Sequence, residues 1–120
     1  MLDVAIALQR FYSSFGIKAY EEHTVPKNAA LPYITYELEE PDWREETTLT
    51  ANVWYSGTSY KPLYSKVDEI SDKIGEGLLW PADGGHLYLY KGSPFAQVAD
   101  TGNDNVKVVY LTIGMHALCK

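Results

Sequence analysis

Residues 30–38, ALPYITYEL, have the pattern of a β-strand that begins directly after a proline. The side chains alternate between two faces, as they do along any extended strand. We expect Ile34, Tyr36 and Leu38 to face the core, because Glu37 on the other face must reach water. Proline suits the start of a strand, where its missing N–H is least needed.

The same alternation returns in residues 47–56, where Leu49, Ala51, Val53 and Tyr55 form the apolar set. An acidic turn separates this segment from residues 33–38. Two alternating segments joined by one connection predict an antiparallel hairpin with a long tip.

Two helices are predicted on either side of this hairpin. Residues 2–14 show apolar side chains at helical spacing, and residues 59–75 show an apolar stripe opposite a charged face. A serine or threonine with a nearby proline begins the second helix, and glycines end it. A short strand over residues 17–20 is expected after the first helix.

The last third of the chain predicts two further strands, over residues 86–91 and 106–117. The segment WPADGG, residues 80–85, is interpreted as a turn. Residues 92–104 are interpreted as a loop, and a loop of that length in a compact domain is usually functional or disordered.

The order of these segments predicts an α+β fold, with residues 1–120 forming a single domain. We expect a single mainly antiparallel sheet with two helices packed on one face, in the order α-β-β-β-α-β-β. Both faces of the strand over residues 106–117 are apolar for much of its length. If helices cover one face, the other requires a neighbouring chain, so the sequence predicts an oligomer.

Composition limits the possible partners. The chain carries 10 basic and 16 acidic residues, a formal net charge of -6, which argues against gripping a phosphate backbone. It has ten tyrosines, which suit protein interfaces and are also favoured in strands. No apolar run approaches the roughly 20 residues of a membrane span. The N-terminal segment lacks the features of a signal peptide, so we expect a protein made and used in a cytoplasm, without a membrane partner.

No residue pattern predicts catalysis, a cofactor or a metal. The acidic residues of segment 37–46 are interpreted as a solvated hairpin tip rather than as paired catalytic carboxylates or a cation site. The three histidines lack metal-ligand spacing, and Cys119 has no second cysteine. The glycines near residues 75–77 and 83–85 are interpreted as turns.

Large aromatic side chains near loops and edges are the best candidates for contacts with another protein. Burial under neighbouring loops is the alternative for Trp43, Trp54, Trp80 and Phe95. The pattern places interface candidates at the hairpin tip, in the long loop and on the spare sheet face: Trp43, Arg44, Phe95, Tyr88, Tyr90, Val108 and Tyr110.

The whole order of segments resembles the bacteriophage tail-terminator, or tail-completion, proteins of long-tailed phages or prophages. The resemblance is carried by the strand PYITYEL at 32–38, the strand end NVWYS at 52–56 and the helix over 59–75, and it covers nearly all of the chain. It rests on pattern, so no functional residue is transferred from the family.

The resemblance implies a ring, typically of six copies, in the virion tail, assembled in the host cytoplasm. Such a ring caps the head-proximal end of the tail tube, ends tube polymerisation and offers a surface for head-tail joining. The implied partners are further copies of the chain, the tail-tube protein and the head-side connector protein. DNA passes through the lumen without specific binding.

Three alternatives remain open at this level. The first is another phage neck or connector protein, or a tail-tube subunit. From a different class, a cytoplasmic small-ligand-binding α+β dimer would use the aromatic loops as a pocket. An enzyme that uses the acidic residues ranks last, because no base, nucleophile or metal set accompanies them.

Overall fold

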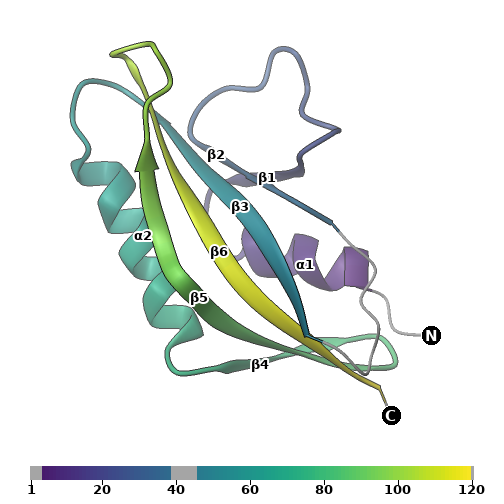
Figure 1. Ribbon diagram of the computed structural model, residues 1–120. Helices are drawn as coiled ribbons and strands as arrows, with labels where there is room; N and C mark the ends of the chain where they lie inside the picture. The colour runs from purple at the N-terminus through teal and green to yellow at the C-terminus, as the bar shows by residue number, and fades with distance from the viewer. Residues whose placement is uncertain (1–3, 39–45, 120) are drawn as a thin grey trace.

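The computed structural model describes residues 4–38 and 46–119. Within these ranges it has two helices and six strands (Figure 1). In chain order they are α1 (Val4–Ser13), β1 (Lys18–Glu21), β2 (Tyr33–Tyr36), β3 (Glu46–Ser56), α2 (Lys61–Ile74), β4 (Leu78–Ala82), β5 (Gly85–Ala99) and β6 (Val106–Cys119).

All six described strands form one sheet in the order β1-β2-β3-β6-β5-β4. The β1–β2 pair is parallel, and the other neighbouring pairs are antiparallel. The sheet is therefore mixed, which corrects the expected mainly antiparallel arrangement. The connection over residues 22–32 accounts for the difference, because it carries the chain back before β2 begins, so that β2 runs in the same direction as β1.

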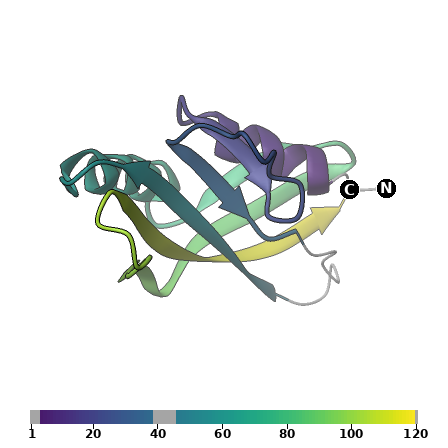
Figure 2. The same cartoon turned by 90° about the horizontal axis from the view of Figure 1, so that it is seen from above.

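Both helices pack on one face of the curled sheet, and Figure 2 shows this layering from above. Helix α1 contacts β1 and β4, whereas α2 contacts β3, β5 and β6. The buried side chains of both helices join those of the strands in one core cluster. We call the side of the sheet that carries the helices the inner face and the opposite side the outer face.

Alternation places the core residues of the hairpin largely as predicted. Leu49, Ala51 and Val53 are fully buried, and so is Ile34. The antiparallel pairing of β2 with β3 confirms the predicted hairpin, whose tip at 39–45 lies outside the described residues. Leu38 is 39% exposed, which corrects its assignment to the core. Strand β2 ends at Tyr36, so strict alternation no longer applies at Leu38.

Strand β4 occupies part of the segment that was predicted as a turn. Trp80 is the reason: its indole packs edge-on against Phe11, with ring centroids 5.5 Å apart, and its Nε1–H donates to the Ala7 carbonyl oxygen at 2.9 Å. Pro81 is tolerated because β4 is the terminal strand of the sheet. The order of elements is thus α-β-β-β-α-β-β-β, one strand more than predicted.

Strand β5 continues to Ala99, through most of the predicted loop at 92–104. The register with β6 shifts between Lys91 and Ala96, and pairing then resumes from Ala96 to Ala99. The glycine and proline that resemble loop residues in the sequence lie within this irregular stretch, which has the character of a β-bulge.

Helix α2 matches its predicted range closely. Ser59 Oγ accepts a hydrogen bond from the Lys61 N–H at 3.2 Å before the first turn. Gly75 ends the helix with φ of 56°, a conformation that favours glycine. Leu63, Val67, Ile70 and Ile74 are buried.

Among the described residues, neither helix has the length and apolar character that a membrane-spanning helix requires.

Candidate interaction surface

The outer face of the sheet keeps several large apolar side chains in contact with solvent. Leu79, Tyr88 and Leu118 are 54%, 38% and 42% exposed, and Tyr110 is 45% exposed. The pairings Leu79 with Tyr88 and His86 with Leu118 place these residues on neighbouring strands of one sheet. An apolar group that both helices leave uncovered is the main candidate for contact with another protein.

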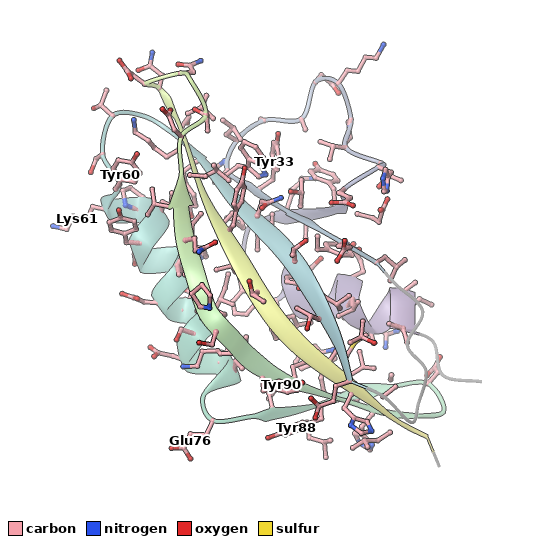
Figure 3. The ribbon with its side chains drawn as sticks, in the orientation of Figure 1. Tyr33, Tyr60, Lys61, Glu76, Tyr88 and Tyr90 are labelled. Atoms are coloured by element: carbon pink, nitrogen blue, oxygen red, sulfur yellow. The ribbon has the colours of Figure 1, made fainter. Side chains whose placement is uncertain are left out.

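Tyr88 and Tyr90 lie on this surface at the end of the sheet where β4 lies (Figure 3). Their ring centroids are 5.8 Å apart. The Tyr90 hydroxyl donates to Glu46 Oε2 at 2.5 Å, which joins β5 to the first residue of β3. This hydrogen bond with Glu46 is the main cause that raises the pKa of Tyr90 to about 12, because ionisation would place two negative charges together.

Two glycines make room for these rings. A Cβ at Gly114 would lie 2.2 Å from two ring atoms of Tyr90, so the ring lies directly over the backbone of β6. A Cβ at Gly77 would lie 2.1 Å from the Tyr88 hydroxyl oxygen. The absence of a side chain at Gly114 lets the Tyr90 ring lie against β6, and its absence at Gly77 lets the Tyr88 hydroxyl approach the turn between α2 and β4.

An open recess of about 580 Å³ adjoins the two rings. Its lining residues come from the start of β3, the end of α2 and β5: Glu46, Gly75, Glu76, Tyr88, Tyr90 and Lys91. We call it the Tyr88–Tyr90 recess. The Glu46 carboxylate and the Tyr90 phenol thus meet at one place, although they are far apart in the sequence.

The other end of the outer face carries an aromatic group that is held by hydrogen bonds. The rings of Tyr20 and Tyr33 are 5.7 Å apart, and those of Tyr33 and Trp54 are 6.4 Å apart. Trp54 Nε1–H donates to Thr35 Oγ1 at 2.9 Å. Thr35 is buried, so this end of the outer face is packed within the chain itself.

The structure separates the five predicted interface residues that it describes into three groups. Tyr88, Tyr90 and Tyr110 lie on the outer face, and their contact with another chain stays a prediction. Val108 pairs with Trp54 of β3 and is only 1% exposed, so it is not available on the surface of the isolated chain. Phe95 belongs to β5 rather than to a loop, and its half-buried ring packs against the core.

Trp43 and Arg44 lie outside the described residues. The sequence prediction also missed Glu46, Leu79 and Leu118 as members of the surface. The alternation of Leu79 with the inward-facing Trp80 is a signal that would have found β4 and, with it, the exposed leucine. Glu46 had no such signal, because its contact with Tyr90 joins residues 44 positions apart.

One described cluster has metal-ligand atoms within reach of one another. Glu21, Glu22 and His23 bring one ligand atom each to within 4.8 Å on the turn after β1. His23 Nδ1 lies 2.7 Å from Glu21 Oε1, and this hydrogen bond is the main cause that raises the pKa of His23. The cluster is explained as an exposed ion pair, and acidic surface groups of this kind are common.

Comparisons with known proteins give one informative match. No protein-family model matches the chain, and a search of curated proteins finds no match. Among solved structures, a chain of the "virion of native gene transfer agent (GTA) particle" matches with a TM-score of 0.63 at 14% sequence identity. The match covers 96% of this chain and 85% of that chain. At this identity the likeness shows a shared fold and nothing more.

Proposed function

We propose that this chain is a structural protein of a phage-like virion. The observation that carries the proposal is the fold likeness to a chain of a gene transfer agent virion, which extends over 96% of this chain and 85% of that chain. The exposed apolar side chains of the outer face add support, because a subunit of an assembly needs a surface of this kind.

Within that class, we propose the role of a tail terminator, which acts by binding rather than by catalysis. The chain would form a ring, with six copies as the family resemblance implies, that caps the head-proximal end of the tail tube and offers a surface for head-tail joining. Two features support this finer proposal: the resemblance of the sequence pattern to tail-terminator proteins, and the net charge of -6, which lets DNA pass a lumen without adhering.

A ring of identical subunits needs two different contact patches on each copy. We assign one of them to the outer face around Tyr88, Tyr110 and Leu118, which are all exposed there.

The test is the mass in solution across concentration, by size-exclusion chromatography with light scattering, followed by negative-stain imaging with and without purified tail tubes. Closed rings of one size, or capped tube ends, are the expected result. Long filaments of the chain alone would identify a tube subunit instead. A compact dimer at every concentration that ignores tubes would contradict the proposal and favour the ligand-binding class.

A matched pair of variants locates the contact. Tyr110 on the outer face and Tyr64 on α2 are both 45% exposed. We expect Tyr110→Ala to weaken ring formation or tube capping, whereas Tyr64→Ala leaves them unchanged. Equal effects of the two substitutions would remove the outer face as the assembly surface.

A further inference from the structure

The Tyr88–Tyr90 recess combines aromatic rings with carboxylates in a way that suits a cation. Glu46 and Glu76 contribute two negative charges to its lining. Of the described residues that line the recess, Lys91 alone is basic, so two carboxylates and one ammonium give the lining a formal net charge of -1. The Lys91 ammonium lies 3.1 Å from Ser71 Oγ and 5.9 Å from the centre of the Phe95 ring, so it is directed towards other partners.

The ring of Tyr90 is held in place before any ligand arrives. Gly114 lies beneath the ring, and the Glu46 carboxylate accepts a hydrogen bond from its hydroxyl at 2.5 Å. A side chain whose orientation is already fixed loses little conformational entropy on binding. The same hydrogen bond sets the carboxylate beside the ring, so that an aromatic surface and a negative charge are presented together.

We propose that this recess binds an arginine side chain of a partner protein. The guanidinium group would stack on the Tyr90 and Tyr88 rings and pair with the Glu46 carboxylate. A planar guanidinium both stacks on aromatic faces and forms directed hydrogen bonds to carboxylates, whereas a lysine ammonium is a compact point charge. The negative lining disfavours a nucleic acid phosphate as the ligand.

The proposed arginine would belong to a partner protein that contacts one end of the proposed assembly surface. The biological meaning of this contact rests on the proposed function, but the recess itself is tested on the isolated chain. Failure of ring formation and failure of arginine binding are therefore separate results.

The test uses the full chain and two probes, arginine amide and citrulline amide, at matched ionic strength. The citrulline side chain has nearly the same shape as that of arginine and lacks the guanidinium charge. Aromatic NMR signals of the tyrosines are followed during each titration. We expect saturable shifts of the Tyr88 and Tyr90 signals with arginine amide, at least about five-fold weaker binding of citrulline amide, and unchanged Tyr33 signals.

Two variants with one charge-matched control complete the design. Glu46→Gln should weaken arginine binding by roughly three- to ten-fold, because it removes the carboxylate and keeps the shape. Glu22→Gln removes the same charge on the exposed turn after β1 and should leave binding unchanged. Tyr90→Phe should weaken binding by a smaller factor, because it keeps the ring and releases Glu46.

The proposal is overturned if Glu46→Gln and the unsubstituted chain bind arginine amide equally. It is also overturned if citrulline amide shifts the same signals as strongly, or if all tyrosines shift together without saturation. Circular dichroism of each variant shows that it is folded, so that loss of binding reports on the recess.

Discussion

The close approach of Tyr90 to Gly114 makes Gly114→Ala a sharp test of the outer face. The new methyl group would lie 2.2 Å from two Tyr90 ring atoms, which is far inside van der Waals contact. Strand β6 pairs with β3 on one side and with β5 on the other, so its backbone cannot move away from the ring. The ring must therefore leave its position, and its hydrogen bond to Glu46 is lost with it.

The expected loss of stability follows from the two contacts that the Tyr90 ring gives up. An exposed hydrogen bond to a carboxylate contributes about 1 kcal/mol, and the covered ring face adds roughly another 0.5 kcal/mol. Alanine is favoured over glycine within a strand by about 0.5 kcal/mol, which offsets part of the loss. The net destabilisation is about 1 kcal/mol, or a melting temperature lowered by roughly 4 °C in a domain of this size.

A double-mutant cycle separates the ring from other effects of the methyl group. In a Tyr90→Ala background the space above Gly114 is free, so Gly114→Ala should stabilise the chain by about 0.5 kcal/mol. Urea unfolding of the four proteins gives the coupling energy, which we expect at about 1.5 kcal/mol.

A second measurement reports on the ring directly. The pKa of Tyr90, raised to about 12 mainly by Glu46, should fall towards the ordinary tyrosine value in Gly114→Ala. A coupling energy near zero, or an unchanged Tyr90 pKa in the variant, would refute the placement of the ring over Gly114.

Three further predictions concern buried side chains of α1 and the hydrogen bond from Lys66 of α2 to Phe15. Phe11 is fully buried, so Phe11→Ala should cost about 3 to 5 kcal/mol in urea unfolding, and a cost below about 1 kcal/mol would contradict its central position. Lys66 Nζ donates to the Phe15 carbonyl oxygen at 2.6 Å, so Lys66→Met should lower the free energy of unfolding by about 1 to 2 kcal/mol. Glu69→Gln removes only the exposed ion-pair partner of Lys66 and should lower it by less than about 0.5 kcal/mol. Equal losses in the two variants would contradict the greater weight given to the bond with Phe15. Burial raises the pKa of Tyr12, so the unfolded chain ionises this phenol first and stability should fall above about pH 10, by roughly 1.4 kcal/mol per pH unit. In Tyr12→Phe that share of the alkaline loss should vanish when unfolding at pH 8 and pH 11 is compared, and an identical decline in both proteins would count against it.

The sequence by itself determined which residues form the core of the long elements. Alternation places Val109, Leu111, Ile113 and Met115 of β6 on one face, and all four are buried in the structure. The stripe of α2 follows from helical spacing in the same way. Both periodicities are local properties of the backbone, so they can be read without knowing what the element packs against.

Only the tertiary structure decided the order of the strands and the composition of the surface. The parallel pairing of β1 with β2, the inclusion of β4 and the continuation of β5 past its irregular stretch all depend on contacts between distant segments. Alternation indicates which side chains share a face, and it contains no information about which strand lies beside which.

The Tyr88–Tyr90 recess shows the same limit at the level of single residues. Tyr88 and Tyr90 were predicted on the spare face, but their ring positions depend on the absence of a side chain at Gly77 and Gly114. The contact with Glu46 joins the start of β3 to β5 across the intervening β6. The sequence alone predicts that Tyr88 and Tyr90 share one face of the sheet. The pairing of strands that are distant in the chain places Tyr90 beside the Glu46 carboxylate.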